Sequence, residues 1–422
     1  MFDIRPGEII EYDYRSSNIP SVSTTSLKIL QWNVERNYEA DGILKKIKEL
    51  DPDVCVLQEI DIDCRRSGNR NHMEELCKTL KMKGVFVCEF WELESPLRKD
   101  RDQGGGLHGN AILTKHELTD IRVIDHQYQP FFWERDGALL NEPRKGRQVL
   151  LITRYTLASV INRPTCPSIL IYNVHLEVFT GIIGRVSVFS ELFQDAHFYT
   201  NQFPYQAIFG DLNTMAHSIA RLSPKYARDR YRFLSLGETE ASWFDRNILG
   251  YHIMDGPLNI RLLTMQRSSW TPLWILKSMF NSSNKLISNW GLSLGIWLTG
   301  FSADVMIKAR NPGFYDGWPI QHDTLHNPAY FGLFKAKLDW TLLRNMEIKH
   351  QQYGNIDYKL SDHQYLMMEV DTDSNDILED DNRRNALWLL RRQQFMNTHR
   401  IGYSRYLVLF VLLVLVLLAL VV

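Results

Sequence analysis

The sequence predicts an α/β protein in which two β-sheets pack together and helices lie outside them. Short apolar runs typical of strands alternate along the body of the chain with segments of helical periodicity. Acidic, amide and imidazole residues recur where the apolar runs end, from Asn33 to His363. Because a rigid sheet can direct the side chains at its strand ends to one point, this pattern also predicts a functional site.

The individual elements follow from periodicity and residue type. Helical spacing of Ile43, Leu44, Ile47 and Leu50 predicts a helix over residues 38–50, and two further helices are expected over 69–82 and 185–198. Strands are expected where β-branched and aromatic residues form apolar runs. These runs are 27–34, 53–60, 85–90, 110–114, 148–155, 168–176, 206–209, 337–343 and 364–370.

Composition limits the classes of protein that fit. The chain has 422 residues, of which 45% are hydrophobic, so it can bury a large core. Its net charge of −1 argues against a sequence-independent nucleic-acid binder with a basic surface, although a local basic groove is compatible with that total. The five cysteines are widely spaced and form no Cys-x-x-Cys pair, which indicates reduced thiols rather than a disulfide framework or a structural zinc site.

The polar residues at the strand ends share one chemical character. Carboxylates and amides are the oxygen ligands of hard cations, and imidazoles and amides bind phosphate oxygens. The set therefore predicts a single site for a hard cation and a phosphate group. Its members are Asn33, Glu35, Glu59, His175, Asp211, Asn213, Asp339, Asp362 and His363.

The motifs that contain these residues resemble, in their order and spacing, those of the endonuclease/exonuclease/phosphatase superfamily. This superfamily includes deoxyribonuclease I, abasic-site endonucleases, inositol polyphosphate 5-phosphatases and neutral sphingomyelinases. The resemblance covers residues 27–370 and implies a four-layer α/β sandwich, with two packed mixed β-sheets flanked by helices. It is carried by Gln31-Trp32-Asn33-Val34-Glu35, Leu57-Gln58-Glu59, Asn173-Val174-His175-Leu176-Glu177, Gly210-Asp211-Leu212-Asn213, Lys337-Leu338-Asp339-Trp340 and Ser361-Asp362-His363.

The resemblance implies a metal-dependent phosphoesterase and assigns ligands to its ion. Glu59 would be the principal carboxylate, with Asn33, Glu35 and Asp362 as the further metal residues. Magnesium suits such a site, because it keeps several waters and needs only one or two carboxylates; manganese is an alternative.

The same resemblance assigns catalytic roles. Asp211 would orient or deprotonate the attacking water, Asn213 would hold this water or a phosphate oxygen, and His175 would bind the scissile phosphate. His363 would act as a general base or as a hydrogen-bond donor to phosphate. Asp339 would pair with His363 and fix its tautomer.

Two other features are ambiguous. The glycines at 104–106 fit neither a Walker pattern nor a dinucleotide fingerprint, which favours a flexible loop near the site over a phosphate loop. Arg185 would contact either a polar group of the substrate or a surface acidic residue.

The end of the sequence predicts a membrane anchor. Residues 406–422 contain only apolar side chains after Tyr406, and as a helix they would rise about 25 Å, close to a hydrocarbon core of about 30 Å. A buried helix is the alternative. Residues 371–405 form an acidic and then basic linker, and residues 1–26 form an N-terminal extension without the apolar stretch of a signal peptide. We therefore expect a single-pass membrane protein whose catalytic domain faces the cytosol.

An apolar insertion at 264–310 bears on the substrate. It is rich in tryptophan and carries Lys277 and Lys285, which suits the interfacial zone of a bilayer, although an ordinary helical subdomain fits as well. The leading hypothesis is hydrolysis of a lipid headgroup phosphoester, with the bilayer as partner, resembling a sphingomyelinase or a phosphoinositide phosphatase. The alternatives are a membrane-tethered nuclease, whose basic groove would use Arg98, Lys99, Arg101, Arg144, Lys145 and Arg147, and a non-catalytic scaffold.

Overall fold

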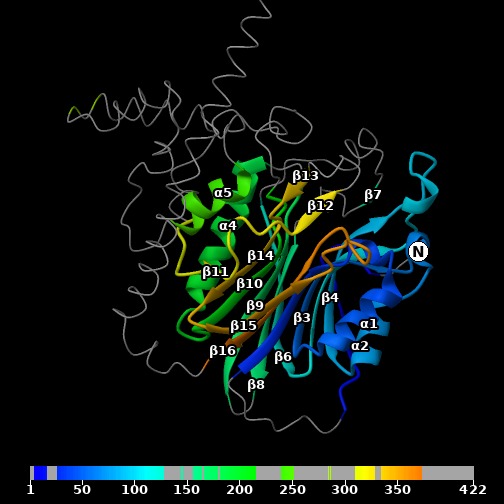
Figure 1. The fold of residues 1–422 in the computed structure, drawn as a ribbon, viewed down its shortest axis with the longest axis horizontal. Coiled ribbons are helices and arrows are strands. Elements are labelled where there is room, and N and C mark those ends of the chain that lie inside the picture. Colours follow the sequence, from blue (N-terminus) through cyan, green and yellow to red (C-terminus); the bar gives the residue numbers. More distant parts are fainter. Residues whose placement is uncertain are drawn as a thin grey trace, which may run out of the picture.

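The computed structural model describes residues 4–16, 26–127, 144–145, 155–163, 166–178, 181–214, 239–250, 284, 286, 309–327 and 334–372. In these residues two mixed β-sheets pack face to face, with a few helices against their outer faces (Figure 1). The α/β fold predicted from the sequence is therefore confirmed for the body of the chain.

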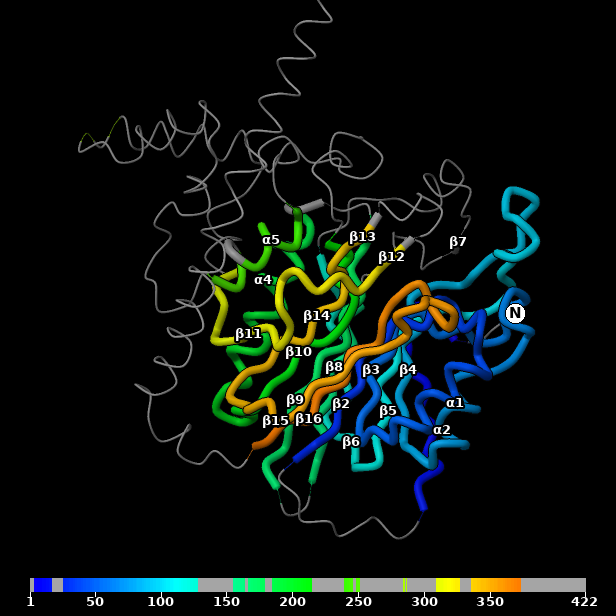
Figure 2. Tube along the Cα trace, viewed as in Figure 1, coloured from blue at the N-terminus to red at the C-terminus, as the bar shows by residue number. Residues whose placement is uncertain are grey.

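The first sheet has the strand order β1-β4-β5-β3-β2-β16-β15, and β7 pairs with β4. Only β2 and β3 run parallel, and β16 (orange) lies beside β2 (blue) although the two are far apart in sequence (Figure 2). The strands are β1 (Ile9–Asp13), β2 (Ser26–Asn33), β3 (Val54–Ile62), β4 (Lys83–Glu92), β5 (Leu107–Thr114), β7 (Arg144–Lys145), β15 (Glu347–Gly354) and β16 (Tyr365–Asp371).

The second sheet has the order β11-β14-β10-β9-β8-β6, in which β9 and β10 run parallel. A separate two-stranded sheet joins β12 (Leu325–Asn327) to β13 (Phe334–Ala336). The strands of the second sheet are β6 (Glu117–Asp125), β8 (Tyr155–Arg163), β9 (Cys166–His175), β10 (Tyr205–Asp211), β11 (Tyr315–Asp316) and β14 (Asp339–Arg344).

Alternation along each strand divides the apolar side chains between two layers of core. In β2, Leu27 and Ile29 point between the sheets, whereas Leu30 and Trp32 point outward. In β10, Ala207 and Phe209 face the same inner core. Polar residues at the same alternate positions of these strands therefore also point into the space between the two sheets.

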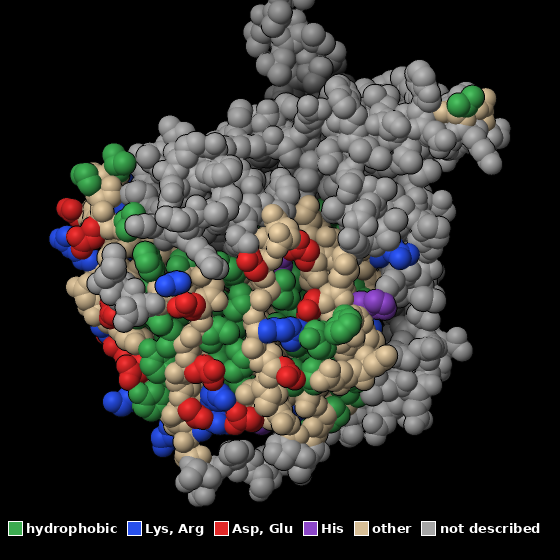
Figure 3. All heavy atoms as spheres, turned by 180° about the vertical axis from the view of Figure 1, so that it is seen from behind, with side chains coloured by type: hydrophobic (Ala, Val, Ile, Leu, Met, Phe, Trp, Pro, Cys, Tyr) green, Lys and Arg blue, Asp and Glu red, His purple; other side chains and the backbone are tan. Residues whose placement is uncertain are grey.

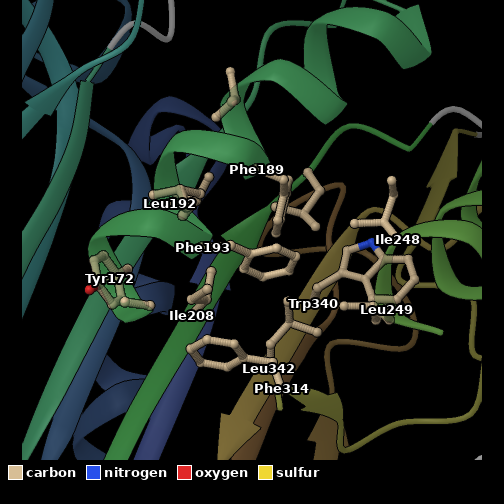
Figure 4. Packing of buried hydrophobic residues seen from close by; sticks show 14 of the residues in the cluster. Tyr172, Phe189, Leu192, Phe193, Ile208, Ile248, Leu249, Phe314, Trp340 and Leu342 are labelled. Atoms are coloured by element: carbon tan, nitrogen blue, oxygen red, sulfur yellow. The ribbon is translucent and has the colours of Figure 1, made fainter. Parts of the chain in front are cut away.

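The helices cover the outer faces. Helices α1 (Ala40–Leu50) and α2 (His72–Leu80) pack on the first sheet through residues such as Ile47 and Met73. Helix α4 (Gly181–Phe198) and the short α5 (Glu240–Phe244) cover the second sheet, where Phe189 and Phe193 contact the outward side chains of β9, β10 and β14 (Figure 4). Full burial of one such side chain contributes about 1.5–3 kcal/mol.

Most predicted elements are present, with shifted ends. The strand predicted over 148–155 has only Tyr155 among the described residues, and a strand, β8, begins there. Strand β1 lies within the predicted N-terminal extension and adds an edge to the first sheet. Four of the five cysteines, Cys55, Cys64, Cys77 and Cys88, are buried, and Cys166 is partly buried.

Three predicted segments fall wholly or almost wholly outside the described residues. They are the span 406–422, the linker 371–405 apart from residues 371–372, and the insertion 264–310 apart from a few positions. In the described part of the chain, no helix has the length and hydrophobicity needed to cross a membrane.

Candidate active site

Three predicted site residues lie side by side at the same register position on neighbouring strands of the second sheet. Asp211, the last residue of β10, is in register with His175 of β9 on one side and with Asp339 of β14 on the other. All three are buried, and alternation turns them to the inner face. The parallel pairing of β9 and β10 is what brings His175 and Asp211 to the same sheet edge.

The first sheet contributes Asn33 and Glu59 from the opposite side of the interface. Asn33 is the last residue of β2, and by alternation it points to the same inner side as Leu27 and Ile29. In β3 the pairing register shifts between Leu57 and Ile60, and Glu59 has a φ of +60°. This bulge turns Glu59 toward Asn33, whereas strict alternation would have pointed it outward with Leu57.

Asn33 links the carboxylates of the two sheets. Its Nδ2 donates to Glu59 Oε1 at 3.2 Å and to Asp211 Oδ2 at 3.1 Å. Its Oδ1 accepts from the backbone N–H of Glu35 at 3.0 Å. The amide therefore fixes the spacing of Glu59 and Asp211 across the interface.

His363 and Asp339 form the predicted pair. His363 Nδ1 lies 2.8 Å from Asp339 Oδ2, which places Nε2 3.7 Å from Asp211 Oδ2. Ser361 holds the loop in place, because its hydroxyl donates to the Asn33 carbonyl at 2.7 Å and accepts from the His363 N–H at 3.1 Å. The imidazole is thus fixed from the first sheet and its carboxylate partner from the second.

The more open side of the site carries three acidic residues and a basic one. Glu35, Glu59 and Asp362 have side chains that are 28%, 22% and 37% exposed, and Glu35 Oε2 accepts from the Asp362 N–H at 2.9 Å. Arg36 Nε lies 3.7 Å from Glu59 Oε2. We call the buried His175, Asp211 and His363 the floor of the site, and the more exposed Glu35, Arg36, Glu59 and Asp362 its rim.

The electrostatics of the floor suit proton transfer. Burial raises the pKa of Asp211 to about 6, with a further increase from Asp339 and a decrease from His363. Burial opposes protonation of His363, but Asp339 and Asp362 outweigh it and raise the pKa of His363 well above the ordinary value. Asp211 can therefore accept a proton near neutral pH, beside an imidazolium held by Asp339.

His175 has a buried partner that sequence reasoning missed. Its Nδ1 lies 3.6 Å from Glu89 Oε2, and Asn110 donates to the other Glu89 oxygen at 2.8 Å. Burial lowers the pKa of His175, but Glu89, Asp211 and Glu59 outweigh it and raise this pKa to about 9. The one available signal was an acidic residue inside the apolar run 85–90, which in β4 is fully buried.

A chain of interior amides was also missed. Gln31 Nε2 donates to Asp339 Oδ1 at 2.9 Å and to Gln58 Oε1 at 2.8 Å, and Gln58 Nε2 donates to Asn173 Oδ1 at 2.8 Å. All three amides are buried between the sheets. Gln31 fixes the orientation of Asp339 from the first sheet, and Gln58 and Asn173 continue the chain of amides to the second sheet. All three lie in the motifs of the family resemblance, but the sequence does not show whether an amide in a strand is buried or exposed.

Asn213 lies at the floor but is tied to backbone. Its N–H donates to Asp211 Oδ1 at 2.8 Å, and its Nδ2 donates to the Leu176 carbonyl at 2.6 Å. The structure thus brings all nine predicted residues into one region. The roles assigned to each in catalysis and metal binding stay predictions.

Three expectations for flanking residues change. Gly106 is packed so closely that a Cβ would lie 2.1 Å from the Ile62 carbonyl oxygen, so close backbone approach accounts for this glycine better than loop flexibility does. Arg98 is buried and pairs with Glu92, which removes it from the predicted basic groove. Arg185 is buried as well, and contacts neither solvent nor the open side of the site.

The other arginines and lysines proposed for the basic groove differ in what the structure describes of them. Arg101 is exposed and stacks over the Tyr38 ring, with its Cζ 4.4 Å from the centroid. The side chains of residues 144, 145 and 147 are outside the description. Seen from behind, the described surface mixes acidic, basic and apolar side chains (Figure 3).

A divalent ion fits the donor set of the rim. Among the described residues, no three His, Cys, Asp or Glu side chains are grouped closely enough to hold an ion by themselves. Magnesium keeps several waters and takes few protein ligands. Burial raises the pKa of Glu35 to about 7, with Asp362 and Glu59 adding to the increase, and a cation between these carboxylates would relieve that repulsion. Glu59 would be the main ligand, with Glu35 and Asp362 nearby.

Gly210, next to Asp211, is required for the approach of β9. It has a φ of +149°, and a Cβ there would lie 1.7 Å from the Val174 carbonyl oxygen. We expect Gly210→Ala to lower the free energy of unfolding by about 2–4 kcal/mol in urea titrations. Gly68→Ala is the control, since its φ is +84° but the nearest atom is 3.7 Å away, and it should cost only about 1–2 kcal/mol. Equal losses in the two variants would contradict this account.

Comparison with known proteins decides the family. The sequence profile of the endonuclease/exonuclease/phosphatase family matches residues 30–363. The chain belongs to this family. It is accordingly a hydrolase of phosphoester bonds. The residues gathered from β2, β3, β9, β10, β14 and the loop before β16 remain its candidate active site.

Solved structures similar to this chain include three proteins of low sequence identity. One is the endonuclease/exonuclease/phosphatase from Beutenbergia cavernae DSM 12333, with 14% identity over 82% of this chain and 71% of that chain and a TM-score of 0.42. Another is ANGEL2, a 2′,3′-cyclic phosphatase, with 14% identity over 88% and 99% and a TM-score of 0.43. The third is the catalytic domain of human Nocturnin, with 14% identity over 87% and 98% and a TM-score of 0.40. No curated protein sequence matches the chain, so the family assignment rests on the profile match.

Proposed function

We propose that this protein hydrolyses a phosphoester of a membrane lipid headgroup, using a divalent ion held at Glu59. The observation that supports a hydrolytic role is the convergence of Glu59, Asp211 and His363, which come from three separate parts of the chain. The lipid substrate and the membrane location are supported by the sequence, through the apolar segment 406–422 and the tryptophan-rich insertion.

The residues of the site divide the work of hydrolysis. Asp211 accepts a proton from the attacking water, whose oxygen forms the new bond to phosphorus while the ester oxygen leaves with the electrons of the broken bond. His175 and His363, as cations, stabilise the negative charge that develops on the phosphoryl group. The Nε2 atoms of the two histidines lie 3.7–3.9 Å from carboxylate oxygens of Asp211 and Glu59, which exceeds hydrogen-bond length. These nitrogens are therefore not hydrogen-bonded to Asp211 or Glu59, and can donate to phosphoryl oxygens. A Mg²⁺ ion held by Glu59, with Glu35 and Asp362 nearby, would supply Lewis-acid stabilisation of the phosphoryl oxygens.

A substrate panel tests the proposal. The purified full chain with Mg²⁺ is assayed on vesicles that contain sphingomyelin, phosphatidylcholine or phosphoinositides, and in parallel on single-stranded DNA, duplex DNA and RNA. We expect turnover of at least one lipid, lost on addition of EDTA and in the Asp211→Asn variant. Ready turnover of nucleic acid with every lipid untouched would overturn the lipid proposal in favour of a membrane-tethered nuclease.

Removal of residues 406–422 tests the proposed anchor. We expect the full chain to float with phosphatidylserine-containing vesicles in a density gradient, and the truncated chain to stay in the soluble fraction, because the apolar segment supplies the insertion energy. The truncated chain should still hydrolyse bis(p-nitrophenyl) phosphate.

The matched control replaces 406–422 by a Leu-Ala segment of the same length, which should restore flotation. A truncated chain that floats as well as the full chain would show that another part of the protein binds the membrane.

A further inference from the structure

Arg185 lies beneath the catalytic loops in a position that neither sequence interpretation anticipated. It belongs to α4, and only 2% of its surface is exposed. Its Nε donates to the Leu212 carbonyl at 2.9 Å, and its Nη2 donates to the carbonyls of Asn213 and Val178, the latter at 3.3 Å. One guanidinium therefore satisfies carbonyl groups from two different loops.

These two loops carry the floor of the site. Residues 176–178 follow His175 at the end of β9, and residues 212–213 follow Asp211 at the end of β10. Two further hydrogen bonds join them directly, from the Leu176 N–H to the Asp211 carbonyl at 2.9 Å and from Asn213 Nδ2 to the Leu176 carbonyl. Buried carbonyl groups need hydrogen-bond donors, and Arg185 supplies the donors that water would supply on an open surface.

The charge of Arg185 is balanced by Glu240, the first residue of α5. Arg185 Nη1 donates to Glu240 Oε1, and the two side chains are 2% and 4% exposed. A buried cation without its partner is strongly unfavourable, so the pair forms as a unit. The five donors of a guanidinium lie in a rigid fork, which an ammonium group cannot reproduce across several acceptors.

From these contacts we infer that Arg185 is a positioning residue for hydrolysis: it fixes the backbone after β9 and after β10, and so holds His175, Asp211 and Asn213 in their relative places. The inference rests on the proposed hydrolytic function of the same site. Within the described part of the chain, the hydrogen bonds of Arg185 go to Glu240 and to the two loops of the second sheet, whereas Glu59 lies on the first sheet. The metal ligand should therefore be unaffected when Arg185 is changed.

Kinetics of Arg185→Lys and Arg185→Met test this role. With bis(p-nitrophenyl) phosphate and Mg²⁺, we expect kcat to fall about 100-fold in both variants, since a displacement of about 1 Å at a reacting group costs this much. KM and the Mg²⁺ concentration for half-maximal activity should change less than about threefold. Arg185→Lys keeps the charge opposite Glu240, so its Tm should stay nearer to that of the wild type than the Tm of Arg185→Met.

Arg344 provides the matched control. It is a buried arginine on β14 at the other end of the same sheet, in register with Gln206, and it bonds Thr200 and Gln206 side chains. Arg344→Met should lower Tm while leaving kcat per folded molecule within about twofold of wild type. Equal losses of kcat in Arg344→Met and Arg185→Met, or full kcat in Arg185→Lys, would overturn the positioning role.

Hydrogen exchange separates this inference from the proposed function. We expect amides in peptides covering 174–178 and 209–214 to exchange at least tenfold faster in Arg185→Met than in wild type, with no such change in Arg344→Met. Unchanged exchange in these peptides refutes the positioning role. A wild-type protein that hydrolyses neither bis(p-nitrophenyl) phosphate nor any lipid or nucleic acid refutes the proposed function, whereas the exchange result still decides whether Arg185 holds the two loops.

Discussion

Asp211→Asn is expected to lower kcat by about a thousand-fold, the largest loss that a nearly isosteric change should produce here. Asp211 Oδ2 lies at the centre of the floor, 3.1 Å from Asn33 Nδ2 and within 3.8 Å of the Nε2 atoms of both histidines. Asparagine keeps an acceptor for the Asn213 N–H but cannot take a proton from water. The measurement is steady-state turnover of the best substrate of the panel at saturating Mg²⁺.

The fold should survive this change. Asp211 is buried near Asp339, so loss of its negative charge relieves repulsion while it weakens attraction to the histidines, and we expect the free energy of unfolding to change by only about 1 kcal/mol. Asp195→Asn is the control, because Asp195 pairs with Arg122 and Tyr172 away from the site and its loss should leave kcat unchanged. More than a tenth of wild-type kcat in Asp211→Asn would exclude Asp211 as the proton acceptor.

Glu59→Gln is expected to raise the Mg²⁺ concentration for half-maximal activity more than tenfold and to lower kcat about a hundred-fold. Burial disfavours the Glu59 carboxylate, but Arg36, His175, His108 and Asn33 outweigh this and hold the pKa of Glu59 at about 2. A permanently ionised carboxylate at the rim is what a hard divalent ion requires. Activity titrations with Mg²⁺ and calorimetric titration with Mn²⁺ measure the two effects.

The control for Glu59 comes from the same sheet. Glu369 on β16 lies opposite Lys28 in the β-ladder, at the far end of β2, and its carboxylate accepts from the Ser26 hydroxyl. Glu369→Gln should therefore alter neither metal binding nor kcat. Wild-type affinity for Mn²⁺ in Glu59→Gln would place the ion elsewhere. Loss of turnover with unchanged Mn²⁺ affinity would instead assign Glu59 to substrate.

The strands predicted from the sequence are those whose residues alternate or form apolar runs, such as β2, β3 and β10. Strand β15 was missed because its residues Glu347–Gly354 are largely polar on both faces, as an edge strand permits. The strand predicted over 148–155 meets β8 only at Tyr155. Residues 156–163 were not predicted as strand, because their buried positions include Thr156 and Ser159, which weaken the apolar signal. Alternation of apolar and polar residues predicts a strand that is buried on one face only, and this signal is absent where the two faces have the same polarity.

The sequence by itself determined the family, nine candidate site residues that the fold brings together, and the presence of strongly apolar segments, because motifs and hydrophobicity are local properties of a sequence. Only the tertiary structure decided in which direction each side chain of the site points and which partners it contacts. Pairing between distant strands creates the bulge that turns Glu59 inward, and it aligns His175 with Asp211 and Asp339. The burial of Glu89 and Arg185 also depends on how distant parts of the chain pack. An acidic or basic side chain looks the same in sequence whether it meets solvent or a buried partner, and only packing distinguishes the two.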